Sequence, residues 1–444
     1  MTKVTDSPGL KKVLKPIHLW AIAVGLVISG EYFGWNYGWA VSGTVGFLVA
    51  TLLITVMYVT FIFSFTELTS AIPHAGGPFA YSYRAFGPLA GFISGYATLV
   101  EFLFAPPAIA FGLGSYVHFL YPAVPVLYTA LACYVLFIGI NSLGIKESAT
   151  FSLVVTLLAV AELLLFMGLV APHFKADNFL ADPIPFGLPG VFAALPFAIW
   201  FYLAIEGVAM VAEEVKDPKR NIPKGYIYGL LTLVFLALGV MVLTGGITNW
   251  KGLSSIDYPL PEALGIALGK QNNWTKFFAS IGLFGLIASF HGCIIGYSRQ
   301  VYALARSGYL PAFLSKVNER FRTPHWALVA GGAVGCFALV TGTTDQVIIL
   351  SVLGAVVMYI MSLLSLFVLR KKEPHLERPF KAPFYPWFPA VALALSLVSL
   401  VAIMYYNAFL SVIFFSGLVF TLSIYLALGK HRKKISNDVL LEKV

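Results

Sequence analysis

The chain has 444 residues, of which 59% are hydrophobic and only 11% are charged. Soluble domains carry about 25% charged residues, so this composition excludes a soluble globular protein and indicates an integral membrane protein. The formal net charge of +9 would also suit a nucleic-acid-binding protein, but the distribution of the charges argues against one.

Long apolar segments follow one another from residue 17 to residue 429. A helix needs about 20 apolar residues to cross the bilayer, and twelve segments are candidates. They span 17–41, 45–69, 87–117, 122–142, 148–172, 189–213, 223–248, 274–304, 325–342, 346–370, 386–406 and 408–429. Since eleven segments follow the first, we do not expect a cleaved signal peptide.

The loop charges predict the orientation of these segments. With the N-terminus in the cytoplasm, all but four of the 29 Lys and Arg residues fall on the inner side, and the exceptions are Lys175, Lys251, Lys270 and Lys276. This asymmetry follows the positive-inside rule and places both termini in the cytoplasm. The basic residues therefore indicate topology and contact with anionic lipid, and nucleic acid is not an expected partner.

The first segment contains the stretch "VISGEYFGWNYGW", which places Glu31 between two glycines and several aromatic residues. Ser29, Gly30 and Gly34 favour local unwinding, because glycine has a low helix propensity. We therefore expect helix 1 to be broken here, with Glu31 at the start of its second half.

The sixth segment carries "LPFAIWFYLAIEGVAM", in which Pro196 and Gly207 flank Glu206. A second break is expected there, again with the acid at the start of the second half. Helices 1 to 5 form the first unit, and an odd number of helices forces the second unit to enter from the opposite side. Broken helices at corresponding places of two inverted halves are typical of a transporter with a site at mid-membrane.

Four glutamates, at positions 31, 101, 162 and 206, lie well inside predicted spans, where an acid costs about 2.5–3.5 kcal/mol. No Lys or Arg lies at comparable depth, so these acids need protons, water or a mobile cation. Glu31 and Glu206 could simply cap the second half-helices. Alternatively they bind a ligand, and a carboxylate at that place repels an amino-acid carboxylate and attracts an ammonium group.

Aromatic side chains cluster at both expected breaks. The candidates for substrate contact are Tyr32, Trp35, Trp200, Phe201 and Tyr202, and Phe33 belongs to the same cluster. Aromatic faces attract ammonium groups by about 0.5–2 kcal/mol. Ordinary packing stays open for each ring, because aromatic residues make up 15% of the chain, and Trp35 and Trp39 would also suit an interfacial belt.

Three further buried groups have two readings each. Glu101 precedes Pro106 and Pro107, so it faces the cavity or hydrogen-bonds backbone groups that the prolines free. Glu162 is a candidate proton carrier or a protonated structural residue in a helix contact. His291 is a candidate proton relay or an interhelical histidine.

Other acids lie near the inner ends of helices. Glu67, Glu213 and Glu214 are expected to form gate or loop salt bridges with Arg84 or Lys216. The sequence contains no nucleotide-binding loop, nucleophile elbow or zinc spacing, so we expect neither an enzyme nor a metal or cofactor. The three cysteines read as small buried residues; they are Cys133, Cys293 and Cys336.

Three inner-side stretches carry a family resemblance: "ELTSAIPHAGGPFAYSYRAFGP" (67–88), "AEEVKDPKRNIPKG" (212–225) and "RQVYALARSGYLPAFLSKVN" (299–318). They resemble the signatures that follow helices 2, 6 and 8 in the amino acid–polyamine–organocation transporters. The resemblance implies an all-α membrane protein with 12 transmembrane helices in a LeuT-type 5+5 inverted repeat, and with substrate between broken helices 1 and 6. The units would be 1–16 (N-terminal tail), 17–172 and 189–370 (the repeats), 386–429 (two further helices) and 430–444 (a basic tail).

The departures from that family are informative. Amino-acid members usually have a small Gly/Ser-rich break in helix 1, whereas this chain has Glu31; the acid of helix 6 is kept as Glu206. Some proton-coupled members have a lysine in helix 5, where this chain has Ala159. The stretches around both breaks are most similar to the ethanolamine permeases.

We therefore expect a secondary active transporter that imports ethanolamine or a closely related small primary amine by alternating access. Its partners would be this amine, membrane lipid and, if the acids titrate during transport, protons. A neutral amino-acid permease, with Glu31 as a pure cap, is one alternative, and a non-transporting membrane sensor is another. The expected location is the plasma (inner) membrane.

Overall fold

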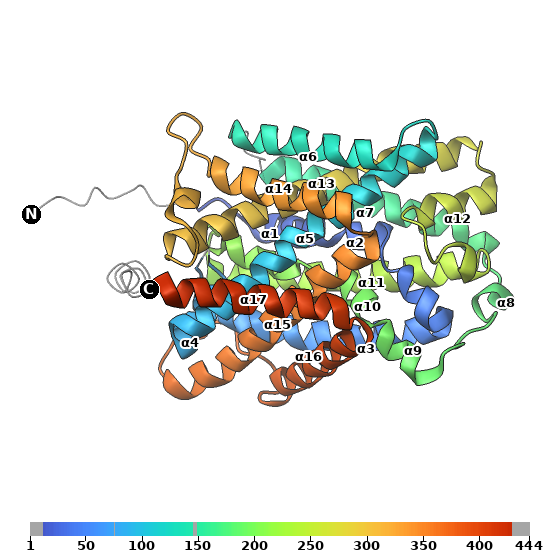
Figure 1. The fold of residues 1–444 in the computed structure, drawn as a ribbon. Helices are drawn as coiled ribbons and strands as arrows, with labels where there is room; N and C mark the ends of the chain where they lie inside the picture. Colours follow the sequence, from blue (N-terminus) through green and yellow to red (C-terminus); the bar gives the residue numbers. More distant parts are fainter. Residues whose placement is uncertain (1–11, 75, 145–148, 429–444) are drawn as a thin grey trace, which may run out of the picture.

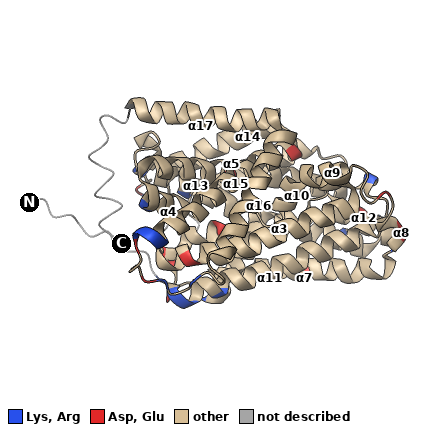
Figure 2. Cartoon of the chain, turned by 90° about the horizontal axis from the view of Figure 1, so that it is seen from below, with Lys and Arg blue, Asp and Glu red and all other residues tan. Residues whose placement is uncertain are grey.

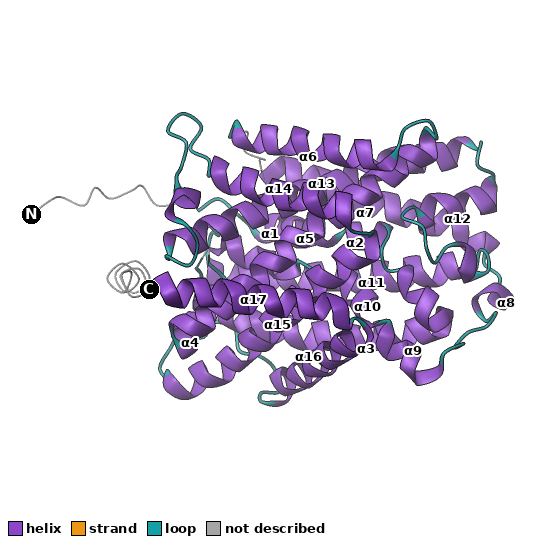
Figure 3. Cartoon of the chain, viewed as in Figure 1, coloured by secondary structure: helices purple, strands orange, loops and turns teal. Residues whose placement is uncertain are grey.

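The computed structural model describes residues 12–74, 76–144 and 149–428. Within these ranges all regular structure is helical (Figure 3), apart from one pairing of extended backbone between Leu14 and Val215. The basic tail expected at 430–444 and most of the N-terminal tail expected at 1–16 lie outside the described residues.

The helices lie side by side in one bundle (Figure 1). The α-helices are α1 Pro16–Val27, α2 Ser29–Tyr32, α3 Tyr37–Ala71, α4 Pro78–Phe86, α5 Pro88–Leu120, α6 Val126–Ser142, α7 Ala149–Val170, α8 Ala176–Phe179, α9 Gly187–Ala193, α10 Leu195–Trp200, α11 Pro218–Gly245, α12 Pro259–Leu268, α13 Asn273–Arg306, α14 His325–Thr341, α15 Thr344–Lys372, α16 Trp387–Tyr406 and α17 Ala408–Leu428. The 3-10 helices are η1 Ala171–His173, η2 Ile205–Glu214, η3 Trp250–Gly252 and η4 Ala312–Ser315.

Nine helical segments in the described ranges are long and apolar enough to cross a membrane. In the most apolar stretch of α5, 78% of the residues are buried, and in that of α15, 83%. In α17 only 17% are buried. The first two therefore form the centre of the bundle, and α17 lies on its outside. These helices make the chain a multi-pass membrane protein.

The bundle has two different ends (Figure 1). We call the end with α4 and the loop 373–386 the basal end, and the end with α8, α9 and α12 the distal end. Figure 2 shows Lys and Arg mainly at the basal end. The first described residues are fixed there, because the N–H groups of Val13 and Leu14 donate to the carbonyl of Glu214, at 2.9 and 3.0 Å, and Lys216 N–H donates to Leu14.

The first half of helix 1 consists of α1 and α2, and it ends at Tyr32. Phe33 is extended (φ −164°, ψ 176°) and Gly34 has φ +89°, a value that glycine adopts without strain. Helical structure resumes at Tyr37. A second interruption at Gly43 (φ +70°) divides α3 into the remainder of helix 1 and the long helix that follows.

The break is shorter than the sequence predicts. Ser29, Gly30 and Glu31 are all helical, so the expectation that Glu31 begins the second half-helix is wrong. Unwinding occurs only from Phe33, because the left-handed conformation there needs Gly34, whereas Gly30 is used for close packing.

Helix 6 is also interrupted. α10 ends at Trp200, the chain turns through residues 201–204, and Ala204 adopts a left-handed conformation (φ 74°, ψ 5°). η2 then begins at Ile205. Glu206 is thus the second residue of the second half, as the sequence predicts.

Candidate functional site

The two interrupted segments touch each other at Gly30. A Cβ atom on Gly30 would lie 2.4 Å from the Trp200 carbonyl oxygen, so only glycine permits this approach. The Trp200 indole N–H donates to the Phe33 carbonyl at 2.9 Å. The break in helix 1 leaves that carbonyl without a helical partner, and a side chain of helix 6 satisfies it.

Glu31 is the acid nearest to this contact. Its side chain is fully buried, and neither Oε1 nor Oε2 has a hydrogen-bond partner in the part of the chain that the structure describes. The capping role considered for Glu31 is therefore wrong, since a cap accepts backbone N–H groups. Tyr32 and Tyr202 lie close enough to interact with its charge.

Glu206 has other neighbours. Its Oε2 accepts from the Tyr359 hydroxyl at 3.3 Å, and Tyr359 and Tyr58 share a hydrogen bond of 2.7 Å. The carboxyl of Glu101 is a neighbour of the Glu206 carboxyl, close enough for their charges to repel each other. Negative charge on two neighbouring buried carboxyl groups is costly, and a bound proton or another cation would lower that cost.

Glu101 is held in place through its own backbone. The Ser351 hydroxyl of α15 donates to the Glu101 carbonyl at 2.7 Å, and α5 continues as a helix through Pro106 and Pro107. The Glu101 carboxyl is buried, has no hydrogen-bond partner among the described residues and lies near Glu206 of helix 6.

The two candidates for proton coupling lie apart from this pair. Glu162 of α7 accepts from the Tyr32 hydroxyl at 2.8 Å, so it contacts helix 1. His291 of α13 is hydrogen-bonded through Nε2 to Asn141 of α6 at 3.1 Å. Glu162 is thus joined to a candidate site residue, whereas His291 links two helices.

The aromatic residues form a packed cluster at the breaks. Trp35 stacks on Phe201 with 5.6 Å between ring centroids and meets Trp39 edge-on at 4.7 Å. Its indole N–H donates to the Glu31 carbonyl at 3.1 Å. Trp35 and Trp39 are fully buried, so the interfacial-belt reading is wrong for both. The Tyr202 hydroxyl is hydrogen-bonded to Thr55 at 2.7 Å.

A small cavity lies between the interrupted helices, α5 and α13. It is lined by Leu26, Val27, Ser29, Ala105, Ile109, Trp200, Leu203, Ala204 and Cys293. Of the candidate site residues only Trp200 lines it, and the lining is mainly apolar. The structure thus brings Glu101 and Glu206 together, and places Glu31 with Tyr32 and Tyr202 beside the same breaks.

Sequence reasoning missed a polar cluster on the distal side of the helix 1 break. The Asp257 carboxylate accepts from the Tyr37 hydroxyl at 2.8 Å and from the Thr344 hydroxyl at 2.7 Å. Asn36 donates to the carbonyls of Leu253 and Ile256 at 2.6 and 2.8 Å. Asn36 and Tyr37 directly follow "SGEYFG", but their partners lie more than 200 residues away and no sequence signal marks them.

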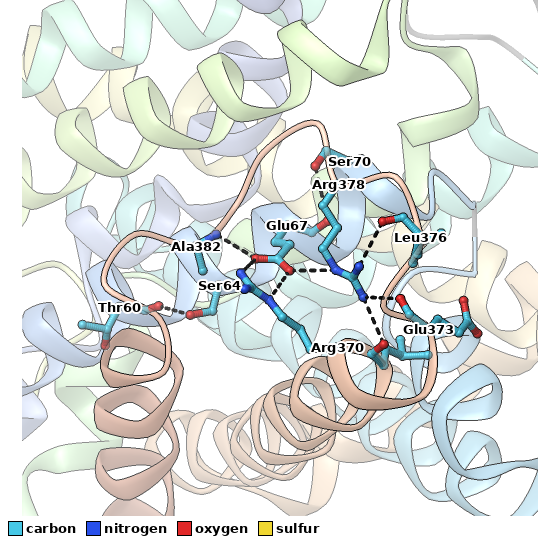
Figure 4. Close-up of polar contacts among 10 residues, drawn as sticks. Thr60, Ser64, Glu67, Ser70, Arg370, Glu373, Leu376, Arg378 and Ala382 are labelled. Atoms are coloured by element: carbon cyan, nitrogen blue, oxygen red, sulfur yellow. Dashed lines mark hydrogen bonds and ion pairs between the residues drawn. The ribbon is translucent and has the colours of Figure 1, made fainter.

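On the basal side, Glu67 is buried, accepts hydrogen bonds from Arg370 and forms an ion pair with Arg378 (Figure 4). Arg84 pairs with Glu373 at 2.8 Å. The expected pairing of Glu67 with Arg84 or Lys216 is therefore wrong. The last turn of α15 and the loop after it each place one arginine at the end of α3, which loop charges alone do not reveal.

No group of three or more His, Cys, Asp or Glu residues in the described ranges is placed to hold a metal ion. The chemistry that the site offers is therefore that of buried carboxyls, tyrosine hydroxyls and aromatic faces. Such groups bind cations and exchange protons.

A bundle of membrane-length helices with buried acids at two interrupted segments defines a polytopic membrane protein that encloses a polar site. The sequence pattern of the family described as "Amino acid permease" matches residues 14–428. The chain belongs to this family, and so to the amino acid–polyamine–organocation superfamily of transporters.

Three relatives illustrate the range of the similarity. An uncharacterized transporter of Rhizobium meliloti is 30% identical over 406 residues, which cover 87% of this chain and 85% of that one. A branched-chain amino acid permease of Bacillus subtilis is 26% identical over 88% of this chain and 87% of its own length. A methylthioribose transporter of the same species is 26% identical over 88% of each chain. The last two names differ in substrate, so family membership does not set the substrate of this chain.

Proposed function

We propose that this transporter imports ethanolamine or a closely related small primary amine. The observation that carries the proposal is Glu31, a fully buried carboxyl with two oxygens that have no partner among the described residues. A buried charge without a partner is expensive. A bound ammonium group would give this carboxyl its partner only when substrate is present.

The surroundings of Glu31 suit such a ligand. Tyr32 and Tyr202 interact with it, and aromatic rings favour a nearby ammonium group by about 0.5–2 kcal/mol. In the proposed site Trp35, Trp200 and Phe201 shape the aromatic wall, and Glu206 with Glu101 supplies the second acidic group. A polar side chain or backbone group would hold the hydroxyl.

The size of the ligand explains why acids are needed. Ethanolamine has few heavy atoms, and at a ceiling of about −1.5 kcal/mol per atom its binding cannot exceed roughly −6 kcal/mol, or tens of micromolar. Apolar contacts alone would stay far below this ceiling. Pairing of the ammonium group with a desolvated carboxylate brings the affinity into a useful range.

The proposal includes the architecture that the resemblance implies. Twelve spans would form two inverted units of five helices plus two further helices, with the basal end in the cytoplasm. Helices 1, 2, 6 and 7 would rock against the remainder in alternating access. Glu162 and His291 are the proposed groups for proton coupling, and the Glu101–Glu206 contact is a further place where a proton could be held.

The proposal is tested by ligand-induced thermal stabilisation of the purified protein, with ethanolamine, serine, alanine and leucine as ligands. We expect stabilisation by ethanolamine alone, and its loss in Glu31→Gln. This variant should be at least as stable as the original chain without ligand, because it removes an unpaired buried carboxyl. Glu262→Gln, which alters an acid paired with Lys270 at the distal end, is the matched control and should keep the ethanolamine effect.

Uptake of labelled ethanolamine into proteoliposomes completes the test. Stabilisation by an amino acid but not by ethanolamine would replace the amine assignment with the amino-acid alternative. Equal ethanolamine binding by the original chain and by Glu31→Gln would remove Glu31 from the site. A folded, ligand-binding protein without any uptake would favour a membrane sensor.

A further inference from the structure

The distal side of the helix 1 break is closed by hydrogen bonds that converge on one loop. Asp257, between η3 and α12, accepts from Tyr37 at the start of α3 and from Thr344 at the start of α15, at 2.8 and 2.7 Å. We call Tyr37, Asp257 and Thr344 the distal clasp. It joins three chain segments at this end of the bundle.

The same loop is tied directly to the break. The side-chain amide of Asn36 donates to the carbonyls of Leu253 and Ile256, and its Oδ1 accepts from Gly34 N–H at 3.0 Å. Gly34 is the left-handed residue of the break. Gly34 lies two residues after Tyr32 and three after Glu31. A displacement of the loop 253–257 therefore also displaces the backbone next to these two residues.

We propose that Asp257 is a gating residue, and that release of the distal clasp opens the enclosed site toward the distal side of the membrane. The clasp links the part of α3 before Gly43 to α15 at this end, while the Glu67–Arg370 pair links the part of α3 after Gly43 to α15 at the basal end. Opening toward the distal side thus requires the clasp to break, whereas the Glu67–Arg370 pair at the basal end can stay formed. The inference rests on membership in the transporter family and stands whichever substrate is carried.

The protonation of Asp257 determines how pH changes the opening of the gate. Burial raises the pKa of this carboxyl to about 6, against 3.8 for an ordinary aspartate, and the donors Thr344 and Tyr37 oppose the shift. Among the described residues Asp345 of α15 also acts on it, and the repulsion from this acid raises the Asp257 pKa further. A carboxyl released into water would regain its ordinary pKa, so the closed clasp binds the proton more tightly. Acidity on the distal side therefore favours closure, and opening becomes easier as the pH rises from about 5 to 7.

A native thiol reports on the gate. Cys293 is buried and lines the cavity beside the two breaks. With Cys133→Ala and Cys336→Ala as background, Cys293 is left as the single thiol of the chain. Its rate of modification by the membrane-impermeant trimethylammonium methanethiosulfonate, added from one side, measures how often the site opens to that side.

The side is fixed by an independent reporter. Tyr121 follows α5 at the distal end and is 64% exposed. The variant Tyr121→Cys, made in a background that also carries Cys293→Ala, has its single thiol on the distal face. Its modification shows whether intact cells or inverted vesicles present that face to the reagent. In that preparation Asp257→Ala should raise the Cys293 rate about tenfold, the change that about 1.4 kcal/mol produces. Tyr37→Phe and Thr344→Val each remove one donor and should give smaller increases if Asp257→Ala does not fold.

Matched controls separate gating from a general loss of structure. Asp182→Asn alters an exposed distal acid that pairs with Lys251 and should leave the rate unchanged. Asp257→Asn cannot titrate at this position. The rate of Cys293 modification in this variant is therefore divided by the rate in the unsubstituted background. This ratio cancels the pH dependence of the thiol and leaves the contribution of Asp257. This ratio should be largest at pH 5 and fall as the pH passes about 6. Unchanged rates in Asp257→Ala, Tyr37→Phe and Thr344→Val, or a ratio that does not change with pH, would overturn the proposal.

Discussion

Glu67 and Arg370 lie 303 residues apart in the sequence and form a two-pronged ion pair at the basal end of the bundle, with hydrogen bonds of 2.8 and 2.6 Å (Figure 4). Arg378 approaches Glu67 Oε1 to 3.2 Å, and the Ala382 N–H donates to Oε2 at 2.7 Å. Only 1% of the Glu67 side chain is exposed. One buried carboxylate thus joins the end of α3 to the end of α15 and to the loop after it.

We expect Glu67→Gln to lower the free energy of unfolding by about 3 kcal/mol, because removal of one partner leaves a buried arginine without its counter-charge. Thermal unfolding in detergent measures the loss. Glu377→Gln removes the acid of an exposed pair with Lys219 and should change stability by less than about 1 kcal/mol. Similar losses in both variants would show that Glu67 contributes no more than a surface charge.

Gly30→Ala tests the contact between the two interrupted helices. The added Cβ would lie 2.4 Å from the Trp200 carbonyl, a distance that forces the backbones apart. We expect folded protein with at least tenfold weaker ligand binding, or about 1.4 kcal/mol, since the aromatic wall and Glu31 would separate. Gly168→Ala, where nothing lies within 4 Å of the new atom, is the control for the same substitution in a helix. Normal binding by Gly30→Ala would mean that the close approach is dispensable.

His74 predicts a pH dependence of stability at the basal end. Its Nδ1 accepts from Gly76 N–H at 2.8 Å, which only the neutral ring can do. Burial lowers the pKa of His74 below the ordinary 6.5; Glu213 opposes this effect, and Arg306 adds to it. The folded state therefore binds the proton less well than the unfolded state, so this contribution to stability is full above pH 6.5 and is lost as the pH falls through the lowered pKa.

The measurement compares thermal unfolding at pH 7.5 and 5.5 for the original chain and for His74→Asn. The asparagine oxygen can accept the same N–H and does not titrate, so the variant should lose less stability on acidification. Because all other titrating groups are shared, the difference between the two proteins reports on His74. Parallel pH profiles would contradict the role of the neutral ring.

The class of protein was accessible from sequence because it depends on composition and on the order of apolar segments. The three sequence motifs predicted the superfamily, and the family match over residues 14–428 confirms it. Glu31 and Glu206 were predictable as candidate site residues because an acid in an apolar span is costly wherever its partners lie. None of these inferences needed a contact between distant residues.

The local geometry of the site depended on such contacts and was harder to predict. Gly30 reads as a helix breaker by propensity, yet it is helical because the Trp200 carbonyl packs against it. The neighbours of Glu206 are Glu101 and Tyr359, which belong to other helices. The role of Asp257 was not predictable, since a single aspartate in a loop forms no sequence motif. Its partners Tyr37 and Thr344 become evident only in the structure.

The backbone pairing of Leu14 with Val215 has a consequence for motion. It joins the chain just before α1 to the chain just after η2, so the basal pieces of the two interrupted helices are connected by main-chain hydrogen bonds that side-chain substitution leaves intact. The distance between spin labels on these two pieces should stay constant throughout the transport cycle. The distance from a label on either piece to one on α5 should change.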